Sequence, residues 1–290
     1  MTDPTTRPLG TLTLPVDRIK VRELARALRA DPETVPPTFT VVAAHHTPAG
    51  GSPNELIIAA AGLDQPRVLL GELSWTYRRP LRTGETLTGT VRLDDRTVRR
   101  GRRGGEMVLA TGTTIWCDEA GAEVQRGRVV LIQPEAPATG GSTVTRPAAA
   151  GPLPEAEPTA DGPPAAADPD TLRLSRTDIV RYAGAAGDFN PVHHDEGHAV
   201  RLGFPGVFAM GLLPGGILAA EAARVLHPRQ LAAVAIRFTG QTWPDVTYRR
   251  HRDPLPATDD RGGGIELGLT GPAGEQTVRV RAYPGQQGGA

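Results

Sequence analysis

Apolar and polar residues alternate along the chain in an order that occurs twice. The first copy opens with an amphipathic stretch, residues 18–29, for which we predict a short helix with Ile19, Leu24 and Leu28 on one face. Residues 52–63 are more uniformly apolar, which predicts a helix buried on most sides. Strand-like runs separated by turn sequences then predict an antiparallel meander. These runs cover residues 68–78, 86–94, 106–117 and 126–133.

The second copy repeats this order after residue 170. Residues 176–185 predict a short helix with Ser175 or Thr177 as its N-cap, and residues 212–225 predict an Ala/Leu-rich helix. Strand-like runs follow at residues 232–239, 265–270 and 276–283. One apolar helix followed by antiparallel strands, twice over, predicts an α+β fold in which each sheet wraps around a central helix.

The segment between the two copies has a different composition. Residues 134–170 are rich in Pro, Ala and Gly and carry no large apolar side chains at helical or strand spacing. Such a segment buries too little surface to offset its ordering entropy, which is typical of a linker. We therefore expect one domain at residues 1–133, a linker at 134–170, a second domain at 171–284 and a disordered tail at 285–290.

Composition excludes several classes of function. The 32 basic and 32 acidic residues cancel, so no overall field favours nucleic acid or an anionic membrane surface. Cys117 is the only cysteine, which excludes an intrachain disulfide and a cysteine-based zinc cluster. The sequence contains neither a secretory signal nor an apolar run of the roughly 18 residues that cross a membrane. We expect a soluble, cytoplasmic protein.

Asp188 and His193 lie in a segment that is able to perform proton chemistry. Pro191 prevents continuation of the preceding helix and biases Asn190 away from helical geometry, so the pair lies in a loop after the helix. A carboxylate and an imidazole that point at one place can hold a water or hydroxyl between them. Adding or eliminating water next to a carbonyl requires one proton moved at carbon and one at oxygen. The spacing alone does not separate such a pair from two unrelated surface residues.

A longer motif surrounds this pair. The sequence YAGAAGDFNPVH, from Tyr182 to His193, with Ala199 and GFPG at residues 203–206, resembles the signature of MaoC-like (R)-specific enoyl thioester hydratases. This resemblance implies a hot-dog fold, the use of no metal or organic cofactor, and Asp188 with His193 as the catalytic dyad.

The same resemblance suggests substrate-binding residues. It implies that Asn190 orients the loop and that the amide of Gly211 faces the thioester carbonyl oxygen from the start of the central helix. An amide at a helix N-terminus stabilises the enolate-like oxygen that forms when an α-proton leaves. With Gly211 and Asn190, we expect its neighbours Phe208 and Leu212 to contact the substrate.

The first copy resembles a second known domain. The sequences PPTF at residues 36–39, LGE at 70–72, YRRPL at 77–81 and GETL at 84–87 are similar to the N-terminal domain of fatty-acid-synthase-type dehydratases. That domain is a hot dog without the dyad, and it shapes the acyl-binding tunnel. Consistent with this, no Gly-Asp-x-Asn-Pro-x-His motif occurs before residue 134. The two resemblances together imply a double hot dog.

The function implied is reversible dehydration of a (3R)-3-hydroxyacyl thioester to a trans-2-enoyl thioester, a hydro-lyase reaction of fatty-acid or polyketide-type metabolism. The expected partners are coenzyme A or acyl-carrier-protein thioesters and a second copy of the chain. Three positions depart from the pattern: Ala186 replaces a frequent Ser, Met210 a common His, and Trp243-Pro244-Asp245 lacks the usual Gly. A non-catalytic acyl-binding or scaffolding subunit and a hot-dog thioesterase therefore stay as alternatives.

Two further clusters have competing interpretations. His194 and His198 have the spacing of metal ligands on a helix, but they also suit the solvated start of a helix, which we favour because no third ligand is evident. Arg99, Arg100, Arg102 and Arg103 predict a solvated hairpin tip or, alternatively, a contact with carrier-protein carboxylates or coenzyme A phosphates.

Overall fold

A computed structural model describes residues 7–44, 51–100, 105–135, 147, 168–227, 230–257 and 262–285. Most of the predicted linker, the predicted tail beyond residue 285, and Arg102 and Arg103 therefore lie outside the described residues. We call residues 7–135 the N-terminal half and residues 168–285 the C-terminal half.

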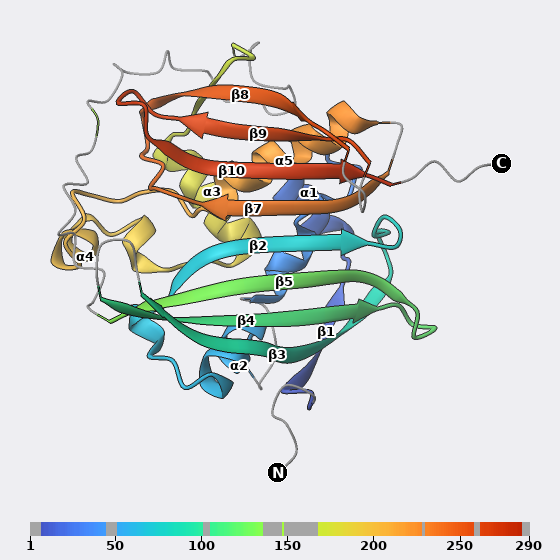
Figure 1. Cartoon of the computed structure of the whole chain (residues 1–290). Helices are drawn as coiled ribbons and strands as arrows, with labels where there is room; N and C mark the ends of the chain where they lie inside the picture. Colours follow the sequence, from blue (N-terminus) through green and yellow to red (C-terminus); the bar gives the residue numbers. More distant parts are fainter. Residues whose placement is uncertain are drawn as a thin grey trace.

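Ten strands form one continuous antiparallel sheet (Figure 1). Its order is β1-β3-β4-β5-β2-β7-β10-β9-β8-β6, so the N-terminal half and the C-terminal half contribute the same internal order, mirrored about the β2–β7 junction. At that junction, residues 72–76 pair with residues 233–237. The strands are β1 (Gly10–Pro15), β2 (Leu69–Tyr77), β3 (Thr86–Arg100), β4 (Glu106–Cys117), β5 (Glu123–Pro134), β6 (Thr171–Arg173), β7 (Leu231–Phe238), β8 (Thr247–Leu255), β9 (Gly264–Thr270) and β10 (Gln276–Pro284).

The helices pack against one face of this sheet (Figure 1). They are α1 (Arg18–Ala27), α2 (Pro53–Ala60), α3 (Arg176–Ala186), α4 (Glu196–Arg201) and α5 (Leu212–Leu226), with 3-10 turns η1 (Phe39–Ala44), η2 (Gln65–Arg67) and η3 (Pro191–His193). Helix α5 is the central helix of the C-terminal half, and most of its residues are buried. Helices α1 and α3 pack against each other. This arrangement confirms the predicted double hot-dog architecture.

The predicted elements form close to their expected positions, and Ser175 is the N-cap of α3, in a capping box with Asp178. One of the three residues predicted for the apolar face of α1 was wrong. Ile19 is 69% exposed, because the face that enters the core is formed by Val21, Leu24, Ala25 and Leu28. These four positions follow the spacing i, i+3, i+4 and i+7 of one helical face, and Ile19 does not belong to it.

The sequence analysis missed three strands and the length of a fourth. Strand β6 has three residues, β8 is rich in arginine, and β1 is a short run of threonine and leucine near the chain start. Strand β3 continues to Arg100 rather than ending near residue 94, because it pairs with β4 as far as Glu106. Arg99 and Arg100 are therefore strand residues at the end of this ribbon.

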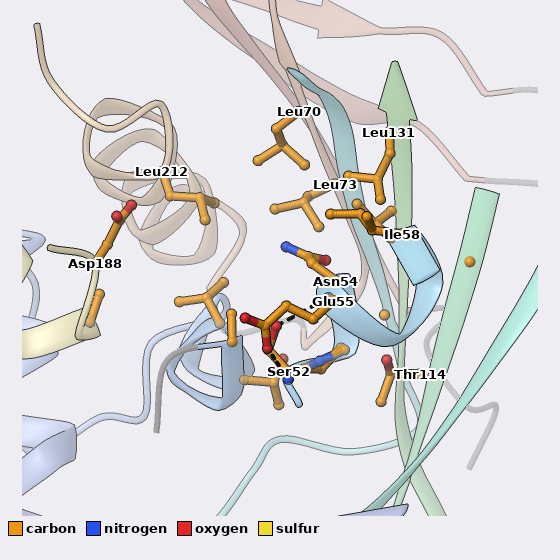
Figure 2. A pocket seen from close by; sticks show the side chains of 18 of the residues that line it. Ser52, Asn54, Glu55, Ile58, Leu70, Leu73, Thr114, Leu131, Asp188 and Leu212 are labelled. Carbon is orange, nitrogen blue, oxygen red and sulfur yellow. Dashed lines mark hydrogen bonds between the residues drawn. The ribbon is translucent and has the colours of Figure 1, made fainter. Parts of the chain in front are cut away.

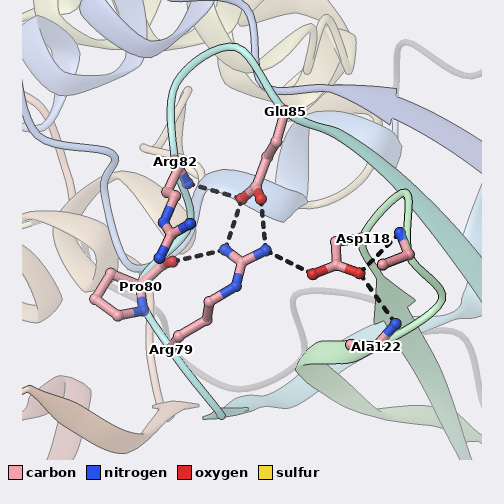
Figure 3. A network of polar contacts seen from close by, with 7 residues as sticks. Arg79, Pro80, Arg82, Glu85, Asp118 and Ala122 are labelled. Atoms are coloured by element: carbon pink, nitrogen blue, oxygen red, sulfur yellow. Dashed lines mark hydrogen bonds and ion pairs between the residues drawn. The ribbon is translucent and has the colours of Figure 1, made fainter.

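Two turns of the N-terminal half are joined by a network around Arg79 (Figure 3). The Arg79 guanidinium donates to both carboxylate oxygens of Glu85, at 3.2 and 2.7 Å, and to Asp118 at 3.0 Å. Asp118 in turn accepts the backbone N–H groups of Ala120 and Ala122. The hydrogen bond from Arg79 lowers the pKa of Asp118 below its ordinary value. The network fixes the β2–β3 turn against the β4–β5 turn.

Candidate active site

The loop that carries Asp188 begins where α3 ends. Gly187 is the C-cap and has a φ of 80°, a left-handed conformation that turns the chain out of the helix. The next residues are held by their own side chains, because Asp188 Oδ1 accepts the Asn190 N–H at 3.3 Å and Asn190 Oδ1 accepts the Val192 N–H at 3.3 Å. Asn190 thus orders the loop between Asp188 and the turn η3.

His193, at the end of η3, is held from two sides. Its Nδ1 lies 2.8 Å from the carbonyl oxygen of Phe208, and the two rings make an edge-to-face contact at 5.1 Å. A carbonyl oxygen only accepts hydrogen bonds, so Nδ1 carries the proton and Nε2 of the neutral ring is an acceptor. Burial lowers the pKa of His193 below its ordinary value, and the negative charge of Asp188 opposes part of this decrease. The neutral imidazole is therefore favoured at neutral pH.

The start of α5 presents unpaired amide groups. Gly211 is its N-cap and is exposed. Within the described ranges, the N–H groups of Gly211 and Leu212 donate to no protein acceptor, whereas the Leu213 N–H donates to Met210 O at 2.9 Å. A Cβ on Gly211 would lie 2.6 Å from Phe238 Cδ1, so a side chain there would displace the ring. The glycine allows β7 to pack closely against the start of α5.

A cavity of about 590 Å³ lies between the two halves. Most of its wall comes from η1, α2, β2, β4 and β5 of the N-terminal half. The C-terminal half contributes Tyr182, Ala186, the loop residues 188–191 and Leu212. Asp188 and Leu212 both line this cavity and lie on the same side of it (Figure 2).

The structure brings the predicted site residues together only in part. Asp188, Asn190 and Leu212 line the cavity, whereas His193, Phe208 and Gly211 are not among its described wall residues. The charge of Asp188 nevertheless acts on His193, and Phe208 holds His193 through its carbonyl oxygen. Phe208 is itself packed between Phe204 and Trp243, with ring centroids at 4.8 and 5.7 Å. Phe208 is thus placed to position the imidazole.

Both halves match known families along their sequences. Residues 11–126 match the FAS1-like dehydratase domain region, and residues 155–248, which include Asp188 and His193, match the MaoC-like domain. The chain joins a FAS1-like dehydratase region to a MaoC-like domain. No curated protein matches the chain.

Solved structures of low sequence identity share this fold. HtdX of Mycobacterium tuberculosis is 19% identical with a TM-score of 0.64, over 95% of this chain and 100% of HtdX. A MaoC-like dehydratase of Phytophthora capsici is 18% identical with a TM-score of 0.66, over 98% of each chain. A conserved hypothetical protein of M. tuberculosis with a double hotdog fold is 16% identical with a TM-score of 0.53, over 94% of this chain and 93% of its own.

Tyr182 is one of the cavity-wall residues of the C-terminal half that were not predicted as site residues from the sequence. Tyr182 is buried and forms part of the cavity wall. Burial raises the pKa of its phenol above the ordinary value, and the nearby charge of Asp188 adds to the increase. The tyrosine begins the motif that contains Asp188, one and a half helical turns earlier, so its place in the motif was the available signal.

The histidines that follow the dyad lie at the start of α4. Exposed His194 makes a 3.1 Å contact with Phe189 O, and the His198 N–H donates to the N-cap Asp195 at 2.9 Å. Across the described part of the chain, no group of three or more His, Cys, Asp or Glu residues is arranged to hold a metal ion. None of the described helices is long and apolar enough to cross a membrane.

Proposed function

We propose that the protein is a hydro-lyase that interconverts a (3R)-3-hydroxyacyl thioester and the trans-2-enoyl thioester plus water. The observation that carries the proposal is the position of Asp188 in the cavity wall, where its charge acts on a histidine whose Nδ1 is fixed by Phe208 O. Coenzyme A and an acyl carrier protein are both candidate thioester carriers. Fatty-acid or polyketide-type metabolism is the proposed context.

The dyad accounts for both proton transfers of the reaction. In dehydration, the C–H electron pair at the α-carbon enters the new double bond while the hydroxyl leaves from the β-carbon with a proton, which gives water. Asp188 and His193 together remove the α-proton and supply the proton to the leaving hydroxyl.

The start of α5 supplies a group that can stabilise the negative charge formed on the thioester oxygen. Negative charge develops on the thioester oxygen as the α-proton leaves. The N–H of Gly211, which meets no acceptor among the described residues, is exposed and lies at the positive end of the helix dipole. We assign it to this oxygen, an interaction that strengthens only as the charge forms.

The residues that line the cavity suggest different roles for the two halves. We propose residues 171–284 as the catalytic hot-dog domain and residues 1–133 as a non-catalytic domain that receives the acyl group. Strands β2, β4 and β5 of the N-terminal half form the wall opposite Asp188, which supports this division.

The test is hydration of crotonyl-coenzyme A, followed as loss of enoyl absorbance. Asp188→Asn removes the charge and is expected to lower kcat/KM by about 10²–10⁴-fold. The matched control is Asp31→Asn, because Asp31 lies in the loop after α1 and only accepts hydrogen bonds within its own turn. Wild-type turnover in Asp188→Asn would contradict the mechanism.

A second candidate is a non-catalytic acyl-thioester-binding or scaffolding subunit. It is favoured by Ala186 and Met210, which are each 2% exposed and leave no hydroxyl or imidazole at those buried positions. This candidate predicts thioester binding with no loss of enoyl absorbance. The third, a thioesterase, predicts release of free thiol from the same substrate.

A further inference from the structure

Tyr182 is a buried, ionisable residue that the proposed mechanism does not use. Its side chain is 1% exposed and forms part of the cavity wall. In the described part of the chain, its phenol hydroxyl has no hydrogen-bond partner. A buried tyrosine hydroxyl usually has one, so the partner of this hydroxyl comes from the cavity, as water or as a ligand.

The hydroxyl of Tyr182 is accessible to such a group. The side-chain amide of Gln125, which is not part of the cavity wall, also lacks a partner among the described residues, but its atoms have no accessible surface. The Tyr182 oxygen is not one of these sealed atoms, although it too lacks a partner. It therefore keeps accessible surface, and this surface faces the cavity because the residue is part of the wall.

Tyr182 and Asp188 lie on the same side of the cavity. Tyr182 and Ala186 are four residues apart on one face of α3 and both line the cavity, and Asp188 follows directly after the C-cap Gly187. The charge of Asp188 acts on the phenol, yet in the described structure no hydrogen bond joins the two side chains. They are thus near enough to interact but do not bond directly, and a small group held by both would lie between them.

The two side chains offer complementary hydrogen bonds. An ionised carboxylate only accepts hydrogen bonds, whereas a protonated phenol donates one. Burial raises the pKa of Tyr182 above its ordinary value, and the charge of Asp188 adds to the increase, so the phenol stays protonated at neutral pH. A water or hydroxyl needs an acceptor for its proton and a donor for its oxygen. Asp188 and Tyr182 supply one of each.

The other described wall residues of the C-terminal half supply at most one more side-chain donor. Asn190 is exposed, and its side-chain oxygen already accepts the Val192 N–H. The remaining wall residues of this half have apolar side chains and are Ala186, Phe189, Pro191 and Leu212. Tyr182 is therefore the buried donor on the side of the cavity that carries Asp188.

We infer that the Tyr182 hydroxyl binds the oxygen at the β-carbon of the substrate, which is the hydroxyl that leaves in dehydration and the water that adds in hydration. This inference rests on the proposed function and adds a third residue to its site. Negative charge grows on that oxygen as the C–O bond breaks, so the hydrogen bond from the phenol strengthens in the transition state. The phenol keeps its proton, and the proton that completes the water comes from the dyad.

The test is Tyr182→Phe, which removes one oxygen atom and keeps the ring in the cavity wall. We expect kcat for crotonyl-coenzyme A hydration to fall by about 10- to 100-fold, because a hydrogen bond of the transition state is lost. KM is expected to stay nearly unchanged, because crotonyl-coenzyme A has no β-oxygen. Urea unfolding should show equal or higher stability, since the removed hydroxyl has no partner among the described residues. An unchanged kcat, or a loss of kcat together with a loss of stability, would overturn the inference.

Tyr77→Phe is the matched control. The Tyr77 hydroxyl donates to Pro37 O at 2.9 Å, and Tyr77 is not one of the described cavity-wall residues. The same one-atom change is expected there to lower the free energy of unfolding and to leave kcat unchanged. The two variants should therefore have opposite effects on activity and stability. Equal losses of kcat in both would overturn the inference.

A binding measurement separates this inference from the proposed function. Calorimetric titration of the His193→Ala variant compares (3R)-3-hydroxybutyryl-coenzyme A with butyryl-coenzyme A. We expect the hydroxylated ligand to bind about three- to tenfold more tightly, and this preference to vanish when Tyr182→Phe is added. Equal binding of the two ligands, or a preference that survives Tyr182→Phe, overturns the inference. If the wild-type protein hydrates no thioester but the preference depends on Tyr182, the proposed function fails and the binding role of Tyr182 stands.

Discussion

The two halves of the sheet share one strand order but differ in what covers their concave faces. The central helix α5 of the C-terminal half has 15 residues and is buried along most of its length, whereas α2 of the N-terminal half has 8 residues, of which only Ile57 is buried. A full-length helix fills one concave face with side chains. The short helix leaves space over β2, β4 and β5, where the cavity lies. The same topology thus gives a packed core in one half and a binding space in the other.

The loops after the first helix of each half differ in a corresponding way. After α1, the Asp31 carboxylate accepts from the Glu33 N–H and the Thr34 hydroxyl, so it serves its own turn. After α3, Asp188 accepts one long bond from Asn190 and lines the cavity. A carboxylate with spare acceptor capacity beside a cavity is available for a ligand, and one saturated by its turn is not.

The largest expected effect comes from removing the imidazole of His193, whose motif has no counterpart in the N-terminal half. His193→Ala is expected to lower kcat for crotonyl-coenzyme A hydration by about 10²–10⁴-fold, because it removes an acid–base group. The neighbouring variant His194→Ala is the control, since His194 is exposed and its ring forms a hydrogen bond with Phe189 O. Equal losses in the two variants would contradict a specific role for His193.

The next largest effect, a loss of activity on long acyl chains, is expected from filling the cavity beside the short helix α2. Leu73 of β2 lines the cavity, and Leu73→Trp is expected to lower kcat/KM for long acyl chains by about tenfold or more while crotonyl-coenzyme A turnover is kept. The measurement is kcat/KM across a chain-length series. Leu69→Trp is the control, because Leu69 is 44% exposed and lies on the same strand. An unchanged chain-length profile would show that acyl groups bind elsewhere.

A smaller effect, a loss of stability, is expected from removing the hydrogen bonds of Arg29 that join the two halves. Arg29 donates to Arg173 O at 2.9 Å and to Asp178 at 3.2 Å, across the α1–α3 contact. Arg29→Ala is expected to reduce the free energy of unfolding by about 1–2 kcal/mol, because these bonds are partly shielded from water. Urea unfolding measures this, with Arg26→Ala of exposed Arg26 as the control. No difference between the two variants would exclude a stabilising role for the Arg29 contacts.

The smallest expected effect is a change in stability from substitutions in two equivalent turns, one in each half. Gly84, with φ 96°, precedes β3 and donates its N–H to Val16 O, and Asp245, with φ 63°, precedes β8 and donates to Leu174 O. The glycine that the family motif has in the second turn is thus replaced by an aspartate in a left-handed conformation. Asp245→Gly is expected to raise unfolding stability by about 0.5–1 kcal/mol, measured by thermal and urea unfolding. The reciprocal Gly84→Asp should lower it, and a loss of stability in Asp245→Gly would contradict the strain.

The sequence predicted the long elements and the chemistry of one loop, because both depend on local patterns. Helix α5 and strand β4 carry their periodicity within themselves, and the dyad lies inside one continuous motif. Strands β6 and β8 were missed because one is three residues long and the other carries four charged side chains near the sheet edge, so neither shows a buried alternating pattern.

The cavity was beyond sequence reasoning for a different reason. It exists because α2 is short and because its walls come from six separate segments of the N-terminal half and from α3, the loop that carries Asp188, and α5. The side-chain amide of Gln125 is buried and has no hydrogen-bond partner among the described residues, which can be seen only when burial and register are both known. Its sequence context, between Val124 and Arg126 in a strand, resembles that of any surface glutamine.

The junction between β2 and β7 has a consequence for how such a molecule acquires asymmetry. Residues 72–76 pair with residues 233–237 through backbone hydrogen bonds, which do not depend on the identity of the side chains. Two separate hot-dog chains with such edge strands would therefore also form pairs of identical chains. Joining the halves in one polypeptide gives the unlike pair an effective concentration that separate chains lack. The N-terminal half then needs no candidate dyad of its own, and the C-terminal half needs no cavity of its own.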